Sequence, residues 1–224
     1  PSQGAFGDAG CDAVVVTPAN FIQYQLPDVP YEGDNPSGET PLGAMQKLFD
    51  WVHEESPESA LYVYEGWAEM DGITGRFPPR ERAFETYHEV NRGDYHQWYL
   101  DLIGMLEVTR PDYEVELIPV ASVLAGLMAE GGPLADVPPA DLYEDSAPHG
   151  TASLYFLAAM VTYAWIYEVP PPEGYRPPAT LLPEVVENYA EIARLIWEAA
   201  PERDARAPAE TGGAETVAEE AEVA

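Results

Sequence analysis

The stretch Asp12-Ala-Val-Val-Val-Thr17 decides the expected fold, because it is β-branched and apolar on both faces. Strands with this composition are typical of parallel sheets that helices cover on both sides. Two later segments, Ala60–Tyr64 and Val115–Val120, are also rich in strand-forming residues and follow turn signals at Ser56-Pro57 and Arg110-Pro111-Asp112. The sequence therefore predicts three parallel strands.

Helical patterns fill the intervals between these strands and continue after the last one. Thr40 is a plausible N-cap for the first helix, and Asn91-Arg92-Gly93 predicts a break within the second pattern. The expected helical ranges are Pro41–Glu55, Arg80–Leu106, Ala121–Glu130, Thr151–Tyr167 and Pro183–Ala199. Strands that alternate with helices predict right-handed βαβ crossovers and an α/β fold.

The charge of the chain limits the classes of partner that it can bind. With 10 Lys+Arg against 40 Asp+Glu, the formal net charge is -30, which repels nucleic acid and anionic membranes. A carboxylate-covered surface is typical of solubility in a salty medium. The single cysteine, Cys11, excludes an internal disulfide and a cysteine-rich zinc site. No calcium-loop motif is present, so we expect neither a metal nor another cofactor.

The chain divides into an α/β domain over residues 1–200 and an acidic tail over 201–224, where Ala, Glu, Pro and Gly dominate and aromatic residues vanish. That composition predicts a disordered tail. The first predicted strand begins close to residue 1, whereas a doubly wound sheet is flanked on both sides of its central strand. We therefore expect that one or two strands are missing upstream or are supplied by something else.

The loop Leu142–Gly150 is the strongest candidate for chemistry. His149 stands between Pro148 and Gly150 just before a helix, and Asp145 is close enough to accept a hydrogen bond from its Nδ1. The alternative is a histidine that only caps the helix and bonds a neighbouring carboxylate.

The order of these parts resembles the SGNH (GDSL-like) serine hydrolases, which hydrolyse esters and have a flavodoxin-like, three-layer α/β fold. The family's Asp and His before the C-terminal helix resemble Asp145 and His149. Its oxyanion asparagine after a strand resembles Asn20, for which an Asx-type turn is the alternative. The resemblance covers roughly residues 11 to 169 and implies a Ser-His-Asp mechanism.

Several positions depart from the family pattern. The aspartate stands three residues before the histidine in the family, where this chain has Ser146, and Pro18 and Phe21 replace the Gly and Asp of the family's G-x-N-D motif. The Gly-Asp-Ser motif that carries the nucleophile is absent, and Ser2 follows no strand. The resemblance therefore implies a nucleophilic serine upstream of residue 1.

Glu65 and Trp67, which follow the second strand, are candidates for binding substrate, with the indole stacking on a sugar. A semi-exposed packing tryptophan is the alternative. His88 and His96 lie eight residues apart across a glycine, a spacing that matches no standard metal site. The leading hypothesis is an esterase acting on a small-molecule or glycan ester. The alternatives are a non-catalytic carbohydrate- or ligand-binding relative and a structural or interaction module.

Overall fold

Three parallel strands form the sheet of this protein. The computed structural model describes residues 6–20, 22–147 and 149–200. The strands are β1 (Ala13–Val16), β2 (Ala60–Tyr64) and β3 (Val115–Ile118), arranged in the order β1-β2-β3. All three predicted strands are confirmed, and both pairings are parallel. The last strand ends at Ile118 because Pro119 has no N–H to continue the ladder.

Helices and one short 3-10 helix make up most of the remaining described chain. The first is η1 (Phe6–Ala9) and the next is α1 (Pro41–Glu55), whose predicted N-cap Thr40 accepts from Gly43 N at 2.8 Å. The others are α2 (Asp71–Thr74), α3 (Glu81–Arg92), α4 (Asp94–Thr109), α5 (Val120–Met128), α6 (Pro139–Leu142), α7 (Ala152–Ile166), α8 (Pro183–Glu187) and α9 (Tyr189–Glu198).

Two helix boundaries test the sequence-based expectations directly. The predicted break after Arg92 is confirmed, because Gly93 separates α3 from α4 with φ −102° and ψ −113°. The single helix expected over Pro183–Ala199 is wrong. Asn188 divides it with φ −94° and ψ 11°, and its side-chain Nδ2 donates to Pro133 O at 3.2 Å. A side chain that bonds a distant carbonyl holds the backbone out of the helical conformation at that point.

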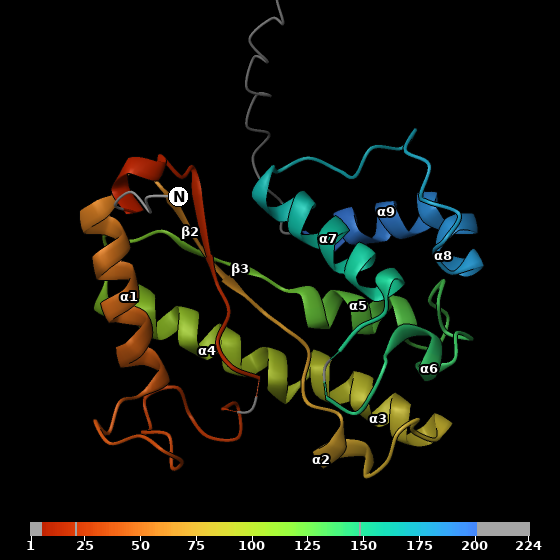
Figure 1. Ribbon diagram of the computed structural model, residues 1–224, viewed down its shortest axis with the longest axis horizontal. Helices are drawn as coiled ribbons and strands as arrows, with labels where there is room; N and C mark the ends of the chain where they lie inside the picture. The colour runs from red at the N-terminus through yellow and green to blue at the C-terminus, as the bar shows by residue number, and fades with distance from the viewer. Residues whose placement is uncertain (1–5, 21, 148, 201–224) are drawn as a thin grey trace, which may run out of the picture.

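The sheet passes between two groups of helices (Figure 1), with α1 and α4 on one side and α5, α7 and α9 on the other. α1 connects β1 to β2, and α2 to α4 connect β2 to β3. The mixed α/β architecture with a small parallel sheet is thus the one predicted.

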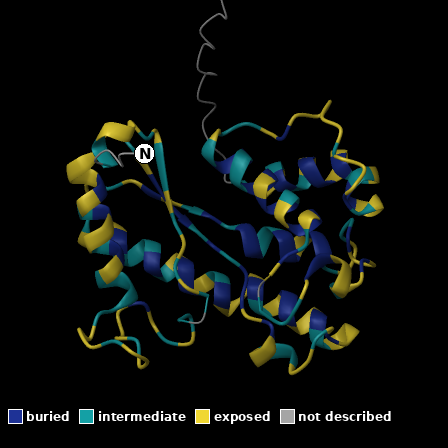
Figure 2. Ribbon diagram, viewed as in Figure 1, coloured by how far each residue is buried: buried dark blue, intermediate teal, exposed yellow. Residues whose placement is uncertain are grey.

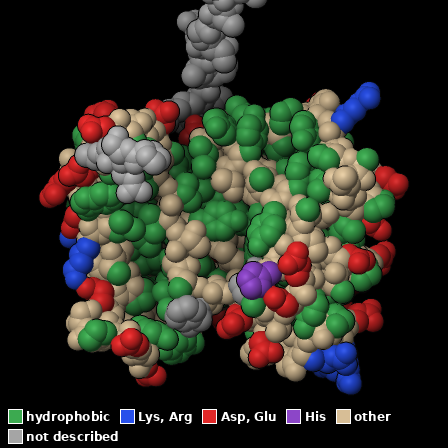
Figure 3. Space-filling view, viewed as in Figure 1, with side chains coloured by type: hydrophobic (Ala, Val, Ile, Leu, Met, Phe, Trp, Pro, Cys, Tyr) green, Lys and Arg blue, Asp and Glu red, His purple; other side chains and the backbone are tan. Residues whose placement is uncertain are grey.

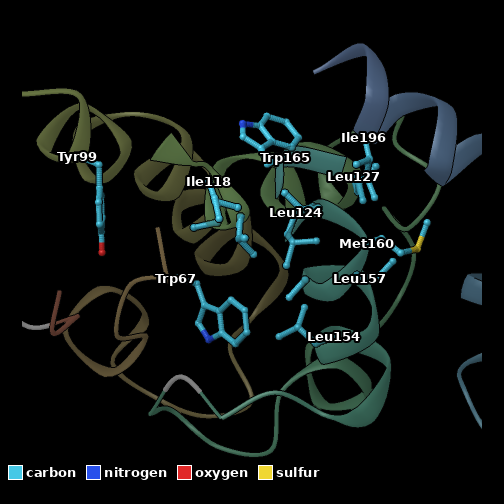
Figure 4. Close-up of a cluster of buried hydrophobic side chains, with 14 of the residues drawn as sticks. Trp67, Tyr99, Ile118, Leu124, Leu127, Leu154, Leu157, Met160, Trp165 and Ile196 are labelled. Atoms are coloured by element: carbon cyan, nitrogen blue, oxygen red, sulfur yellow. The ribbon is translucent and has the colours of Figure 1, made fainter. Parts of the chain in front are cut away.

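The hydrophobic core extends from the sheet into both groups of helices (Figure 2). Phe49 of α1, Val63 of β2 and Leu102 of α4 are each 0% exposed. Figure 4 shows a cluster on the other side, where Leu124 of α5 and Leu157 of α7 face each other.

One flank of the sheet lies open. Among the described residues β1 pairs with β2 alone, and its Val15 is 40% exposed. α7 carries no charged residue, yet its Tyr155 and Tyr167 are 51% and 67% exposed. Beside α7 lies a groove of about 500 Å³, lined by Tyr64, Tyr155, Ala158, Ala159, Thr162, Tyr163, Ile166 and Tyr167. Figure 3 shows hydrophobic side chains in the hollow between the two halves of the molecule.

The predicted acidic tail, residues 201–224, lies outside the described residues, and so does Ser2. The last described helix, α9, ends at Glu198, shortly before the expected end of the domain. Within the described ranges, no helix combines the length and apolar character that a bilayer crossing requires.

Two leucines on α4 test the core. Leu102 is 0% exposed and Leu100 is 43% exposed, so the same substitution samples buried and half-exposed sites on one helix. Leu102→Ala should lower the free energy of unfolding by about 2 to 5 kcal/mol, because it leaves a cavity. Leu100→Ala should cost less than about 1 kcal/mol. Chemical denaturation measures both, and equal losses would contradict the burial of this face of α4.

Candidate functional site

Three strand ends meet at one edge of the sheet, because all three strands run in the same direction. Asn20 follows β1, Glu65 follows β2 directly, and Ser122 lies in the first turn of α5 after β3. The turns that leave β1 and β2 are in contact, since a Cβ atom on Gly66 would lie 4.0 Å from Thr17 Cγ2. Open α/β sheets bind ligands at this edge.

The loop 143–150 is closed on itself and tied to this region. Tyr143 and Gly150 form an antiparallel bridge at the base of the loop. Met70 N–H, in the segment after β2, donates to Ser146 O at 3.0 Å. The backbone of the loop is therefore held at both its base and its tip.

Trp67 also supports the loop, from the hydrophobic core. Its indole is 7% exposed, and its ring centroid lies 6.4 Å from that of Tyr143, at an interplanar angle of 81°. A second ring, that of Tyr155 on α7, lies 5.9 Å away. Figure 4 shows the indole within the cluster of buried side chains. Trp67 therefore packs in the core and is more buried than the semi-exposed packing tryptophan named as the alternative to sugar stacking.

Asp145 and His149 are brought together in the loop. His149 Nδ1 lies 2.8 Å from Asp145 Oδ2, and the two side chains are 62% and 50% exposed. The hydrogen bond to Asp145 raises the pKa of His149, and the charges of Asp145 and Glu144 add to this effect, while desolvation opposes it. Because Nδ1 is engaged by the carboxylate, Nε2 is the ring nitrogen left to exchange a proton.

The other oxygen of this carboxylate is enclosed. Asp145 Oδ1 is shielded from solvent and has no hydrogen-bond partner among the described residues. A shielded oxygen without a donor costs free energy, so Asp145 Oδ1 is a candidate acceptor for a donor group of a ligand.

Asn20 presents an unused donor at the same edge. Its Nδ2 is shielded from solvent and donates to no acceptor within the described chain. A buried amide donor without a partner is costly, so such a group is a candidate for binding a ligand oxygen. The loop that carries it is anchored nearby, because Gln23 Nε2 donates to Ala19 O at 2.8 Å and to Tyr99 OH at 3.2 Å.

Glu65 is the buried partner of a carboxylate–imidazole hydrogen bond at the centre of the edge. Its side chain is 0% exposed; Oε1 accepts from Ser122 N at 2.7 Å, and Oε2 lies 2.5 Å from His96 Nδ1. The hydrogen bond that His96 donates to Glu65 raises the pKa of His96, and the charge of Glu65 adds to the effect, whereas burial of the ring opposes it. Glu65 therefore lies beneath the surface, and its partner His96, on the first turn of α4, carries the exposed nitrogen.

Sequence reasoning missed this second pair, because it considered His96 only as a possible metal ligand together with His88. The structure separates those two histidines. His88 is 3% exposed, and neither of its ring nitrogens has a partner among the described residues; burial, helped by Arg92, lowers its pKa to about 4. A usable signal was present in Glu65 itself, because a carboxylate directly after a buried strand needs a cationic or N–H partner.

Neither a metal-ligand cluster nor similarity to a known protein adds residues to this site. Across the described ranges, no group of three or more His, Cys, Asp or Glu side chains is placed to hold a metal ion. No family model matches the chain, and no curated protein or solved structure matches it. The site consequently rests on its own geometry, and the SGNH resemblance stays a sequence-based prediction.

Substitutions in the loop test the electrostatics of His149. Asp145→Asn should lower the pKa of His149, because it removes both the charge and the acceptor that stabilise the imidazolium. Glu144→Gln is the matched control and should lower the pKa less, since Glu144 acts only through its charge. NMR titration of the imidazole Hε1 signal measures both. An Asp145→Asn titration that coincides with the wild type would show that the pair does not exist in solution.

Proposed function

We propose that this chain supplies the base, its carboxylate and an oxyanion donor of an SGNH-type ester hydrolase, with a nucleophilic serine outside residues 1–224. The substrate class is an ester-linked acyl group on a small molecule or a carbohydrate. One observation carries the proposal: a closed loop holds His149 Nδ1 2.8 Å from Asp145 Oδ2 at the region of the strand ends. The unpartnered donor of Asn20 at the neighbouring strand end supports it.

In this mechanism His149 accepts the serine proton at Nε2 as the serine oxygen attacks the ester carbonyl. Asp145 stabilises the imidazolium and keeps the proton on Nδ1. Asn20 Nδ2 donates to the oxygen on which negative charge develops. His149 then returns the proton to the leaving alcohol, and water repeats the sequence to release the acid. Every step uses protein groups, water and substrate.

The open flank of the sheet supports an origin of the serine in another segment. A strand that paired in parallel with the free edge of β1 would end beside Asn20. A helix leading back from that strand would cover the groove beside α7, whose apolar face is otherwise exposed to water. In this arrangement the sheet has the flavodoxin-like, three-layer form, and the serine stands at the end of the added strand.

A fluorophosphonate probe tests the proposal on the native polypeptide, with the chain of residues 1–224 measured in parallel. We expect one adduct on a serine outside this chain and none on residues 1–224. His149→Ala should lower the labelling rate about a hundredfold or more, because the serine loses its base. His53→Ala is the matched control and should not, since His53 is exposed on α1.

The other outcomes of this experiment would contradict the proposal or favour another function. An adduct on Ser122 or Ser146 would place the nucleophile inside the chain and contradict the proposed arrangement. An unlabelled native polypeptide that still binds a glycan would favour the non-catalytic relative. Labelling that persists in His149→Ala would remove His149 from the reaction.

The donor role of Asn20 predicts a kinetic signature once a substrate is found. Asn20→Ala should lower kcat about a hundredfold to a thousandfold with little change in KM, because the bond to the oxyanion forms only in the transition state. Asn35→Ala is the control, since Asn35 bonds Tyr31 O and Glu39 O and acts on folding. A loss of stability in Asn20→Ala with unchanged kcat would support the turn interpretation instead.

The base role of His149 also sets the pH profile. A base must be neutral to act, so activity should fall as pH decreases through the pKa of His149, which Asp145 holds above the ordinary value. In Asp145→Asn this acid limb should move to lower pH. A flat profile between pH 5 and 8 would contradict the role.

A further inference from the structure

Glu65 and His96 form a carboxylate–imidazole pair that the proposed hydrolysis does not use. We propose that His96 is a second acid–base group of the strand-end edge, held in place by Glu65, which exchanges a proton at Nε2 with an oxygen atom of a bound ester, acid or alcohol. The inference rests on contacts of Glu65 and His96 alone and stands whether or not His149 is the base of an esterase.

Hydrogen bonds hold the Glu65 carboxylate in place. Glu65 is 0% exposed, and both of its oxygens accept hydrogen bonds, one from Ser122 N and one from His96 Nδ1. Ser122 lies in the first turn of α5, where free N–H groups and the helix dipole favour negative charge. These contacts satisfy both carboxylate oxygens, and the contact with His96 holds a proton on Nδ1 of the imidazole.

The orientation of the His96 imidazole leaves one ring nitrogen without a partner in the described part of the protein. With Nδ1 facing Glu65, His96 Nε2 has no hydrogen-bond partner among the described residues, and the side chain is 25% exposed. His88 shows the contrast, because both of its ring nitrogens are sealed from solvent. Only His96 therefore combines a buried carboxylate on one nitrogen with a second nitrogen open to a ligand.

The third step is the set of groups that face the pair. Besides Glu65, these are Tyr95 and Tyr99 on α4, on which the charge of Glu65 acts, and Tyr64 on β2, which interacts with Tyr99. Burial raises the pKa of Tyr64 to about 12 and raises the pKa of Tyr95 and Tyr99 further, so all three are neutral at physiological pH. The charge that acts on His96 is thus that of Glu65, and the imidazolium is stabilised.

The position of the pair completes the argument. A carboxylate buried for structure alone could be satisfied by backbone donors, as Oε1 already is by Ser122 N. Here the second partner is an imidazole whose far nitrogen reaches solvent at the edge where open α/β sheets bind ligands. In the transfer, the Nε2–H bond breaks and an O–H bond forms on the ligand. The neutral ring keeps the proton on Nδ1, where it is hydrogen-bonded to Glu65, and Nε2 regains a proton from the solvent.

Carbethoxylation of the full chain by diethyl pyrocarbonate tests the inference, because the reagent attacks neutral, accessible imidazole nitrogens. The rate at each histidine is followed by peptide mass spectrometry from pH 5.5 to 8.5. We expect His96 to react with a midpoint above the ordinary value of about 6.5. His88 should remain unmodified until the protein is unfolded in urea, whereas the exposed His53 should be modified in the folded protein.

Glu65→Gln and Glu69→Gln form a matched pair in one segment, one buried and one exposed. Glu65→Gln should lower the midpoint and raise the rate at pH 6.5 about twofold to tenfold, because more of the ring is neutral. Glu69→Gln should leave the profile of His96 unchanged. Protection of the buried His88 reports in the same digest whether each variant is folded.

Two results would overturn the inference. The first is a His96 that reacts only in urea, which would mean that Nε2 is closed to ligands. The second is a midpoint that Glu65→Gln does not lower. If Glu65→Gln does not fold, the unsubstituted chain decides: a midpoint above the ordinary value supports the inference, and one at or below it overturns it.

Discussion

The buried carboxylate of Glu65 is the constraint on which the strand-end region depends. A charge with 0% exposure is tolerated only when it is paired, and Glu65 is paired twice, with α5 through Ser122 N and with α4 through His96. Its backbone continues the sheet as well, since Glu65 N donates to Ile118 O at 3.0 Å and Glu65 O accepts from Ala121 N. One residue therefore fixes two helices of opposite layers to the end of β2.

The hydrophobic effect sets the second constraint, on the opposite flank. An α-helix without charged residues is stable in water only when its whole surface is covered, but α7 is covered on the side of α5 and α9 and open beside β2. The free edge of β1 lies on the same flank and offers unpaired backbone groups. One additional strand and helix would satisfy both features, and the proposed origin of the serine rests on this.

Local patterns in the sequence were sufficient for most of the fold. The β-branched runs predicted all three strands, and Thr40 and Gly93 marked helix boundaries through their own chemistry. Asp145 and His149 could be paired because they are four residues apart in one loop. Glu65 and His96 are 31 residues apart, and their contact depends on how α4 packs beneath the sheet. The break at Asn188 likewise depends on a distant carbonyl, that of Pro133.

The two imidazole pairs differ in how they respond to the acidity of the chain. With a formal net charge of -30, the surface field favours every imidazolium, but salt screens that field beyond about 10 Å at 0.1 M and about 3 Å at 1 M. The Asp145–His149 pair is more than half exposed on the histidine side, so its stabilisation weakens as salt rises. The Glu65 carboxylate is sealed in the protein and is screened much less. The proton affinity of His149 should therefore vary with ionic strength, whereas that of His96 is set by a single buried contact.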